Sequence, residues 1–162
     1  MFVGGPGKKL RAGTWIWCLG NSTFGRIDPP DCKKCEKEAR ENAGRSETKE
    51  RNNCDNTLGY KVLCAERGSP EFEVAAAAGQ RALVSVGIVS LYACPTYLLS
   101  LCDKDLLEYG FRAVLTDRWP KRGEVLEQAA PLVQATHVIG DVVKKYKEWD
   151  HENRTRNPGY GR

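Results

Sequence analysis

Cysteines carry most of the side-chain chemistry that this 162-residue sequence offers. Cys32 and Cys35 form a C-x2-C pair, and Cys54 and Cys64 form a C-x9-C pair in the same polar half of the chain. Four thiolates are a common ligand set for tetrahedral Zn²⁺, so these four cysteines are candidate zinc ligands. They are also disulfide candidates if the chain meets an oxidising compartment. A third interpretation leaves them as thiols without a role, which also suits Cys94 and Cys102.

The C-x9-C pair from Cys54 to Cys64 resembles one half of the twin motif of small disulfide-linked helical hairpin proteins in the mitochondrial intermembrane space. The resemblance covers only this pair, because the second C-x9-C of that family is missing from the sequence. It implies disulfide-bonded cysteines and an intermembrane-space location for this part of the chain.

The sequence contains no Walker loop, no G-x-G-x-x-G after a strand and no H-E-x-x-H. His137 lies beside the apolar side of a predicted helix, and His151 lies in a charged tail, so neither is a good catalytic candidate. A redox enzyme using Cys32 and Cys35 ranks last, because the pair does not follow a strand pattern. We therefore expect a protein that is not an enzyme and has no cofactor, resident metal ion or small-molecule substrate.

The stretch from Ala82 to Cys102 is uncharged throughout, although 28% of the chain is charged. A helix of that length rises about 31 Å, close to the roughly 30 Å hydrocarbon core of a bilayer. Ser90 and Cys94 are small residues four positions apart, a spacing that lets another helix approach closely. The pattern predicts one transmembrane helix over about 74/82–102.

The alternative is a buried pair of elements, with a strand at 84–88 and a helix opened by Pro95. A core of this kind needs apolar partners, and the sequence offers one full apolar helix face, at 124–149. The membrane-spanning interpretation is therefore favoured over the buried one.

The predicted fold class is mainly α, with three parts. Residues 1–73 are expected to be an extended, largely irregular and polar region, 74–102 the transmembrane helix, and 103–162 a helical region with a polar tail. Within the last part, a long amphipathic helix is expected over about 124–149. The residues expected to pack against partner subunits are aromatic, small or apolar: Trp15, Trp17, Ser90, Cys94, Leu132, Ile139 and Val143.

Basic residues are more frequent just after Cys102 than just before Ala82, so the C-terminal side is expected to face the matrix and the N-terminal side the intermembrane space. The net charge of only +4 argues against nucleic acid as the partner. The function predicted from these patterns is a non-catalytic accessory subunit of a large mitochondrial inner-membrane complex, such as a respiratory-chain complex or ATP synthase. Its partners would be other protein subunits and membrane lipid. The alternative is a soluble zinc- or disulfide-stabilised binding protein of a ribonucleoprotein such as a mitochondrial ribosome.

Overall fold

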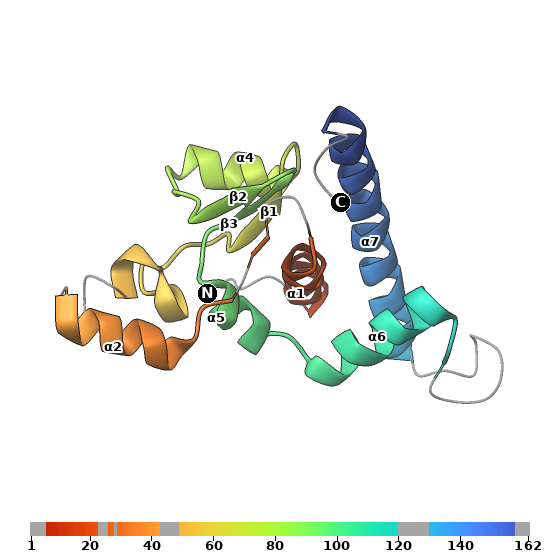
Figure 1. Cartoon of the computed structure of the whole chain (residues 1–162), viewed down its shortest axis with the longest axis horizontal. Helices are drawn as coiled ribbons and strands as arrows, with labels where there is room; N and C mark the ends of the chain where they lie inside the picture. The colour runs from red at the N-terminus through yellow and green to blue at the C-terminus, as the bar shows by residue number, and fades with distance from the viewer. Residues whose placement is uncertain (1–5, 23–25, 28, 43–48, 120–129, 158–162) are drawn as a thin grey trace.

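A computed structural model describes residues 6–22, 26–27, 29–42, 49–119 and 130–157 and shows a mostly helical chain with one small sheet (Figure 1). The elements are, in chain order, α1 (Pro6–Gly20), α2 (Cys32–Asn42), the 3-10 helix η1 (Cys54–Asn56), β1 (Cys64–Glu66), α4 (Pro70–Ala77), β2 (Val84–Val86), β3 (Val89–Leu91), α5 (Pro95–Ser100), α6 (Lys104–Thr116) and α7 (Ala130–Arg156).

The stretch 82–102 is not a helix, so the predicted transmembrane helix is wrong. Its first half forms the antiparallel hairpin of β2 and β3, which turns at Gly87, where φ is +59° and glycine is favoured. Strand β1 pairs with the other edge of β3, which gives the sheet order β1-β3-β2. The second half becomes α5, with Pro95 as its first residue, a position where proline costs little. Among the described residues, no helix combines the length and the apolarity that crossing a membrane would require.

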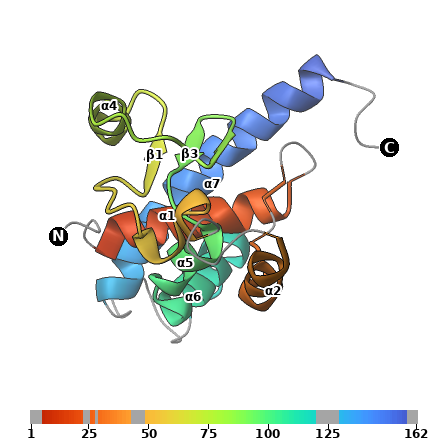
Figure 2. The same ribbon diagram turned by 90° about the vertical axis from the view of Figure 1, so that its left-hand side faces the viewer.

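The N-terminal segment is the central helix of the fold rather than an irregular region. Ala12, Trp15, Ile16 and Leu19 follow the i, i+3, i+4, i+7 spacing of one helix face, and all four are buried. Helix α1 packs against α5, α6 and α7. In both views it lies near the middle of the molecule, and in Figure 1 it stands between α7 and the part formed by the sheet and α5 (Figures 1 and 2). The apolar partner that the 82–102 stretch needed is therefore this helix as well as α7.

A long helix was expected over 124–149; α7 begins at Ala130 and continues to Arg156, and residues 124–129 lie outside the described part of the chain. Its buried face packs against α1 and α6. At Gly110 of α6, an added Cβ would meet the side chain of Ile139, so the glycine allows close approach of α6 and α7. One core thus draws residues from the regions 1–73, 74–102 and 103–162.

Candidate functional site

Four cysteines line one pocket of about 270 Å³, which we call the thiol pocket. Cys32 and Cys35 lie at the start of α2, Cys54 opens η1, and Cys94 is the residue before α5. Three of these were predicted to belong together. Cys64, the expected fourth member, lies on β1 and does not line this pocket, and Cys94 is found there instead.

Two hydrogen bonds connect the three segments that carry these cysteines. The buried Asn53 side chain donates from Nδ2 to the carbonyl oxygen of Tyr92 at 2.7 Å, which joins the segments of Cys54 and Cys94. The Thr96 hydroxyl donates to the carbonyl oxygen of Pro30 at 2.7 Å, which joins the start of α5 to the residues before α2. The pocket is therefore assembled by contacts between residues far apart in the sequence.

The turn at η1 has an unusual backbone. Asn53, Asp55 and Asn56 all have positive φ, at 40°, 53° and 56°. Asn and Asp tolerate this left-handed conformation better than other residues with a side chain. Oδ1 of Asn53 also accepts a hydrogen bond from the N–H of Leu58 at 2.9 Å, which closes the turn. This geometry places Cys54 on the wall of the thiol pocket.

Helix α2 lies at the edge of the molecule (Figure 1) and is polar on all sides apart from its cysteines. Asp31 precedes it, and its carboxylate accepts a hydrogen bond from the N–H of Lys33 at 2.9 Å, an arrangement typical of a helix start. Glu36 and Arg40 form an i, i+4 ion pair at 4.0 Å, a spacing that supports a helix. With no apolar stripe to bury, the helix presents its cysteines as the groups that face the rest of the chain.

The cysteines differ in their electrostatic surroundings. Burial raises the pKa of the Cys54 thiol, and the neighbouring acidic groups of Cys94, Asp55, Cys35 and Cys32 raise it further. Burial raises the pKa of Cys64 to about 12, with a contribution from Glu66. The effect of the other three pocket thiols on the pKa of Cys54 reflects their closeness to it, whereas Cys64 belongs to a separate environment on the sheet.

None of the seven cysteines, all of which lie in the described part of the chain, forms a disulfide. Within the same residues, no group of three or more His, Cys, Asp or Glu side chains is placed so that it could hold a metal ion as it stands. The thiol pocket is thus lined by four thiols that are not joined by disulfides.

A larger hollow of about 790 Å³, which we call the groove, adjoins the thiol pocket and shares Pro30, Asn52 and Cys94 with it. Its rim carries three exposed arginines from separate segments, and its only acidic lining residue among those described is Glu50. The remainder of the lining is largely apolar or aromatic: Ile27, Leu58, Tyr60, Ala82, Leu83, Val84 and Pro95. The arginines are Arg26, Arg51 and Arg81.

The residues expected to pack against partners mostly lie inside this chain. Trp15 is 1% exposed, and Leu132, Ile139 and Val143 are buried in the core. The Ser90 hydroxyl is 3.0 Å from that of Ser85 across the β2–β3 hairpin. Cys94 is buried on the wall of the thiol pocket. Trp17 is the exception, since it is 42% exposed and its ring centroid lies 4.0 Å from that of Phe111.

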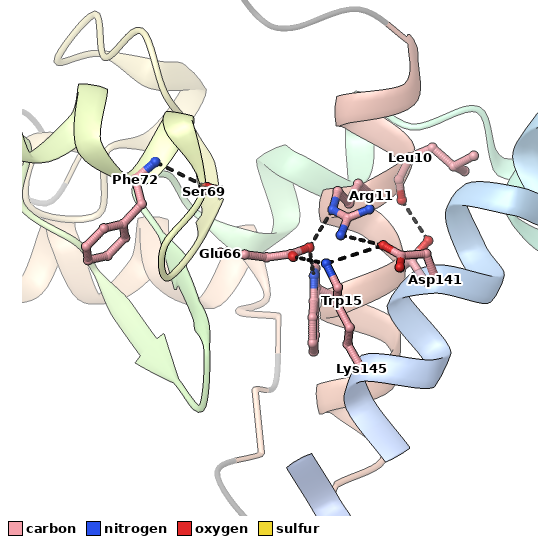
Figure 3. Close-up of polar contacts among 9 residues, drawn as sticks. Leu10, Arg11, Trp15, Glu66, Ser69, Phe72, Asp141 and Lys145 are labelled. Carbon is pink, nitrogen blue, oxygen red and sulfur yellow. Dashed lines mark hydrogen bonds and ion pairs between the residues drawn. The ribbon is translucent and has the colours of Figure 1, made fainter. Parts of the chain in front are cut away.

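A second cluster of charged side chains surrounds Glu66 at the end of β1 (Figure 3). Its carboxylate accepts hydrogen bonds from Arg11, from Nε1 of Trp15 at 2.9 Å and from Nζ of Lys145 at 2.7 Å. Arg11 also lies 2.7 Å from Oδ2 of Asp141 on α7. The cluster joins the sheet to α1 and α7, and every member has a partner, so we assign it a structural role.

The pKa of Glu66 reflects that arrangement. Burial by itself would raise the pKa, but the hydrogen bonds from Arg11, Lys145 and Trp15 outweigh burial and lower the pKa to about 2. The carboxylate is therefore ionised at neutral pH and is held in that state by its partners.

Sequence reasoning missed two features of the site. Cys94 was assigned to the apolar stretch, and no local pattern marks it as a neighbour of Cys32, Cys35 and Cys54. The groove was missed because its arginines lie on separate segments.

Comparison of the chain with protein-family models, with curated proteins and with solved structures gave no significant match. Function is therefore inferred from the residues themselves.

Proposed function

We propose that this protein is a non-catalytic subunit of a hetero-oligomeric protein complex and that the groove binds an acidic segment of a partner protein. The observation that carries the proposal is that three exposed arginines and a set of apolar residues line one open hollow. Arginine binds carboxylates in bidentate geometry, and apolar surface beside the arginines favours peptide side chains. A protein segment with acidic residues around one or two apolar ones would complement both features.

A protein partner suits the groove better than a nucleic acid does. The net charge of the chain is only +4, and Glu50 stands among the arginines. Nucleic-acid sites concentrate more positive charge and offer aromatic rings for base stacking. The one aromatic ring of the described lining belongs to Tyr60, whose hydroxyl accepts a hydrogen bond from the N–H of Arg81 at 3.4 Å.

The proposal names no organelle. The mitochondrial inner membrane was predicted from the stretch 82–102, and that stretch forms part of the sheet and core of this fold. A mitochondrial setting therefore stays a prediction, and the same experiment that tests the complex tests it through the identity of the co-purifying subunits.

The test is native gel filtration of mild extracts from source cells that express the tagged chain. The wild type should elute in a complex, and Arg51→Glu/Arg81→Glu should shift it to the monomer, because two attractive contacts become repulsive. The control, Arg67→Glu/Arg118→Glu, makes the same change of charge at two exposed arginines outside the groove and should leave the complex intact.

Two results would contradict the proposal: a wild type that elutes as a monomer, or a groove variant that stays in the complex. Digestion of the extract with ribonuclease separates it from the ribonucleoprotein alternative. A protein-only complex survives digestion, whereas one held by RNA does not.

A further inference from the structure

We propose that Cys32, Cys35, Cys54 and Cys94 bind one Zn²⁺ ion as a four-thiolate structural site that fastens α2 to the rest of the chain. This inference stands apart from the proposed function of the groove. It replaces Cys64, the ligand that sequence spacing suggested, with Cys94.

Four thiols of the chain line one common space. They come from three segments separated by long stretches of chain, and all four line a pocket of about 270 Å³. The hydrogen bonds from Asn53 to Tyr92 and from Thr96 to Pro30 hold those segments next to one another. A disulfide uses two thiols, whereas a single thiophilic cation uses all four.

The C-x2-C pair lies at the start of α2. Sulfurs three residues apart on one helical turn can reach one metal ion, which is the spacing found in many zinc sites. Cys32 and Cys35 have that spacing, and α2 begins at Cys32.

Polar residues dominate α2. Helix α2 has no apolar stripe with which to pack, and a polar helix of this length is marginal by itself in water. A metal ion would supply the attachment that apolar burial does not. For the same reason, Cys32 and Cys35 can move with α2 toward Cys54 and Cys94 at little packing cost. That movement is needed because the four side chains are not yet in coordinating positions.

Binding of Zn²⁺ by the four cysteines changes both the protonation and the charge of the site. Binding replaces four S–H bonds by four Zn–S bonds and releases four protons, with no change of oxidation state. Four thiolates on a divalent cation leave two negative charges. Lys33 and Lys34 lie between the two cysteines of α2, and Lys49 lines the pocket, so basic side chains stand near that charge, while Glu36 and Asp55 of the lining oppose binding.

The first experiment measures metal in the full-length protein purified without chelator, and titrates the metal-free protein with Co²⁺. We expect one Zn²⁺ per chain and the visible bands of tetrahedral cobalt thiolate. Cys32→Ser changes an exposed side chain and should lower the affinity for Co²⁺ by at least the roughly 10–100-fold that loss of an outer-shell partner costs. Cys94→Ser should do the same, and Cys64→Ser should retain the affinity.

A second measurement needs no variant. Residue-resolved alkylation of the wild-type protein, with and without Zn²⁺, should show protection by Zn²⁺ at the four pocket cysteines and an unchanged response at Cys18, Cys64 and Cys102. The inference is overturned if Co²⁺ gives no thiolate spectrum or if Zn²⁺ protects none of the four. It is also overturned if two of the four form a disulfide in the freshly purified protein, or if Cys64→Ser loses the metal while Cys94→Ser keeps it. The partner complex is measured separately, so either proposal can fail alone.

Discussion

Nζ of Lys145 on α7 lies 2.7 Å from Oε2 of Glu66 on β1, 79 positions earlier in the chain. This contact links the C-terminal helix directly to the sheet. Arg11 and Trp15 of α1 contact the same carboxylate, so three separate elements depend on one acidic side chain.

Replacing that carboxylate should destabilise the protein strongly. Glu66→Gln removes the less exposed of the two carboxylates that Arg11 and Lys145 share and leaves them only Asp141. Loss of one member of a fully buried pair costs about 3–5 kcal/mol, and the partial exposure of the two cations reduces this to about 2–4 kcal/mol. Urea unfolding monitored by circular dichroism measures the change.

The matched control is Glu71→Gln, which removes a more exposed carboxylate that lies 2.7 Å from Lys8. Exposed pairs contribute about 0.2–1 kcal/mol, so this variant should remain close to the wild type. Equal losses in the two variants would contradict the special role of Glu66.

The contribution of Glu66 should depend on pH in a defined window. Its pKa falls from the ordinary 4.5 to about 2 in the folded protein. A lowered pKa means that the unfolded chain binds the proton first, so the stabilisation is fully present above about pH 5 and is lost as pH falls toward 2. The difference in unfolding free energy between wild type and Glu66→Gln should therefore shrink between pH 5 and pH 2. A constant difference over that range would refute the assignment.

Replacing each of two helix glycines by alanine should change the stability of the protein in opposite directions. Gly110→Ala places a methyl group against Cδ1 of Ile139, which is fully buried, and should cost about 1–3 kcal/mol through overpacking. Gly140→Ala meets open space within α7 and should stabilise by about 0.5–1 kcal/mol through helix propensity. Thermal unfolding of the two variants measures both effects, and a gain in stability for Gly110→Ala would show that α6 and α7 are further apart than described.

Asn53→Gly tests the side-chain hydrogen bonds that Asn53 makes beside the thiol pocket. Glycine accepts the positive φ of Asn53, so the change isolates the hydrogen bonds to Tyr92 and Leu58 from backbone strain. Leaving those buried groups without partners should cost about 1–3 kcal/mol. Chemical unfolding measures the change in the free energy of unfolding. An unchanged stability would mean that the hydrogen bonds of Asn53 do not hold the segments of the pocket together.

The sequence allowed some helices to be anticipated because their signals are local. The i, i+4 pairs of α2, such as Glu36 and Arg40, are visible in the sequence because their residues are one turn apart. Even so, residues 1–73 were predicted to be largely irregular, because α2 has no apolar stripe. The apolar spacing of α7, seen at Leu132, Ile139 and Val143, is also local.

The remaining features depend on distant partners. The alternative of a buried strand at 84–88 and a helix opened by Pro95 is close to the structure, but the transmembrane helix was favoured over it. An uncharged stretch has the same composition whether it spans a bilayer or forms a hairpin and a short helix inside a core. In the folded chain, α1 supplies apolar partners through its buried residues Trp15, Ile16 and Leu19, whereas the sequence predicted that Trp15 and Trp17 pack against partner subunits. In the same way, the place of Cys94 in the thiol pocket depends on Asn53 reaching Tyr92 across 39 positions, a distance that no local pattern encodes.

The central position of α1 also bears on the order in which the protein can fold. Arg11 contacts Asp141 at a separation of 130 residues, and α1 is covered by α7 on one side. During synthesis, α1, with the apolar face that packs on α7, is made before α7. Contacts of such long range slow folding and leave intermediates with exposed apolar surface. The face of α1 that packs on α7 should therefore stay exposed until α7 has been synthesised.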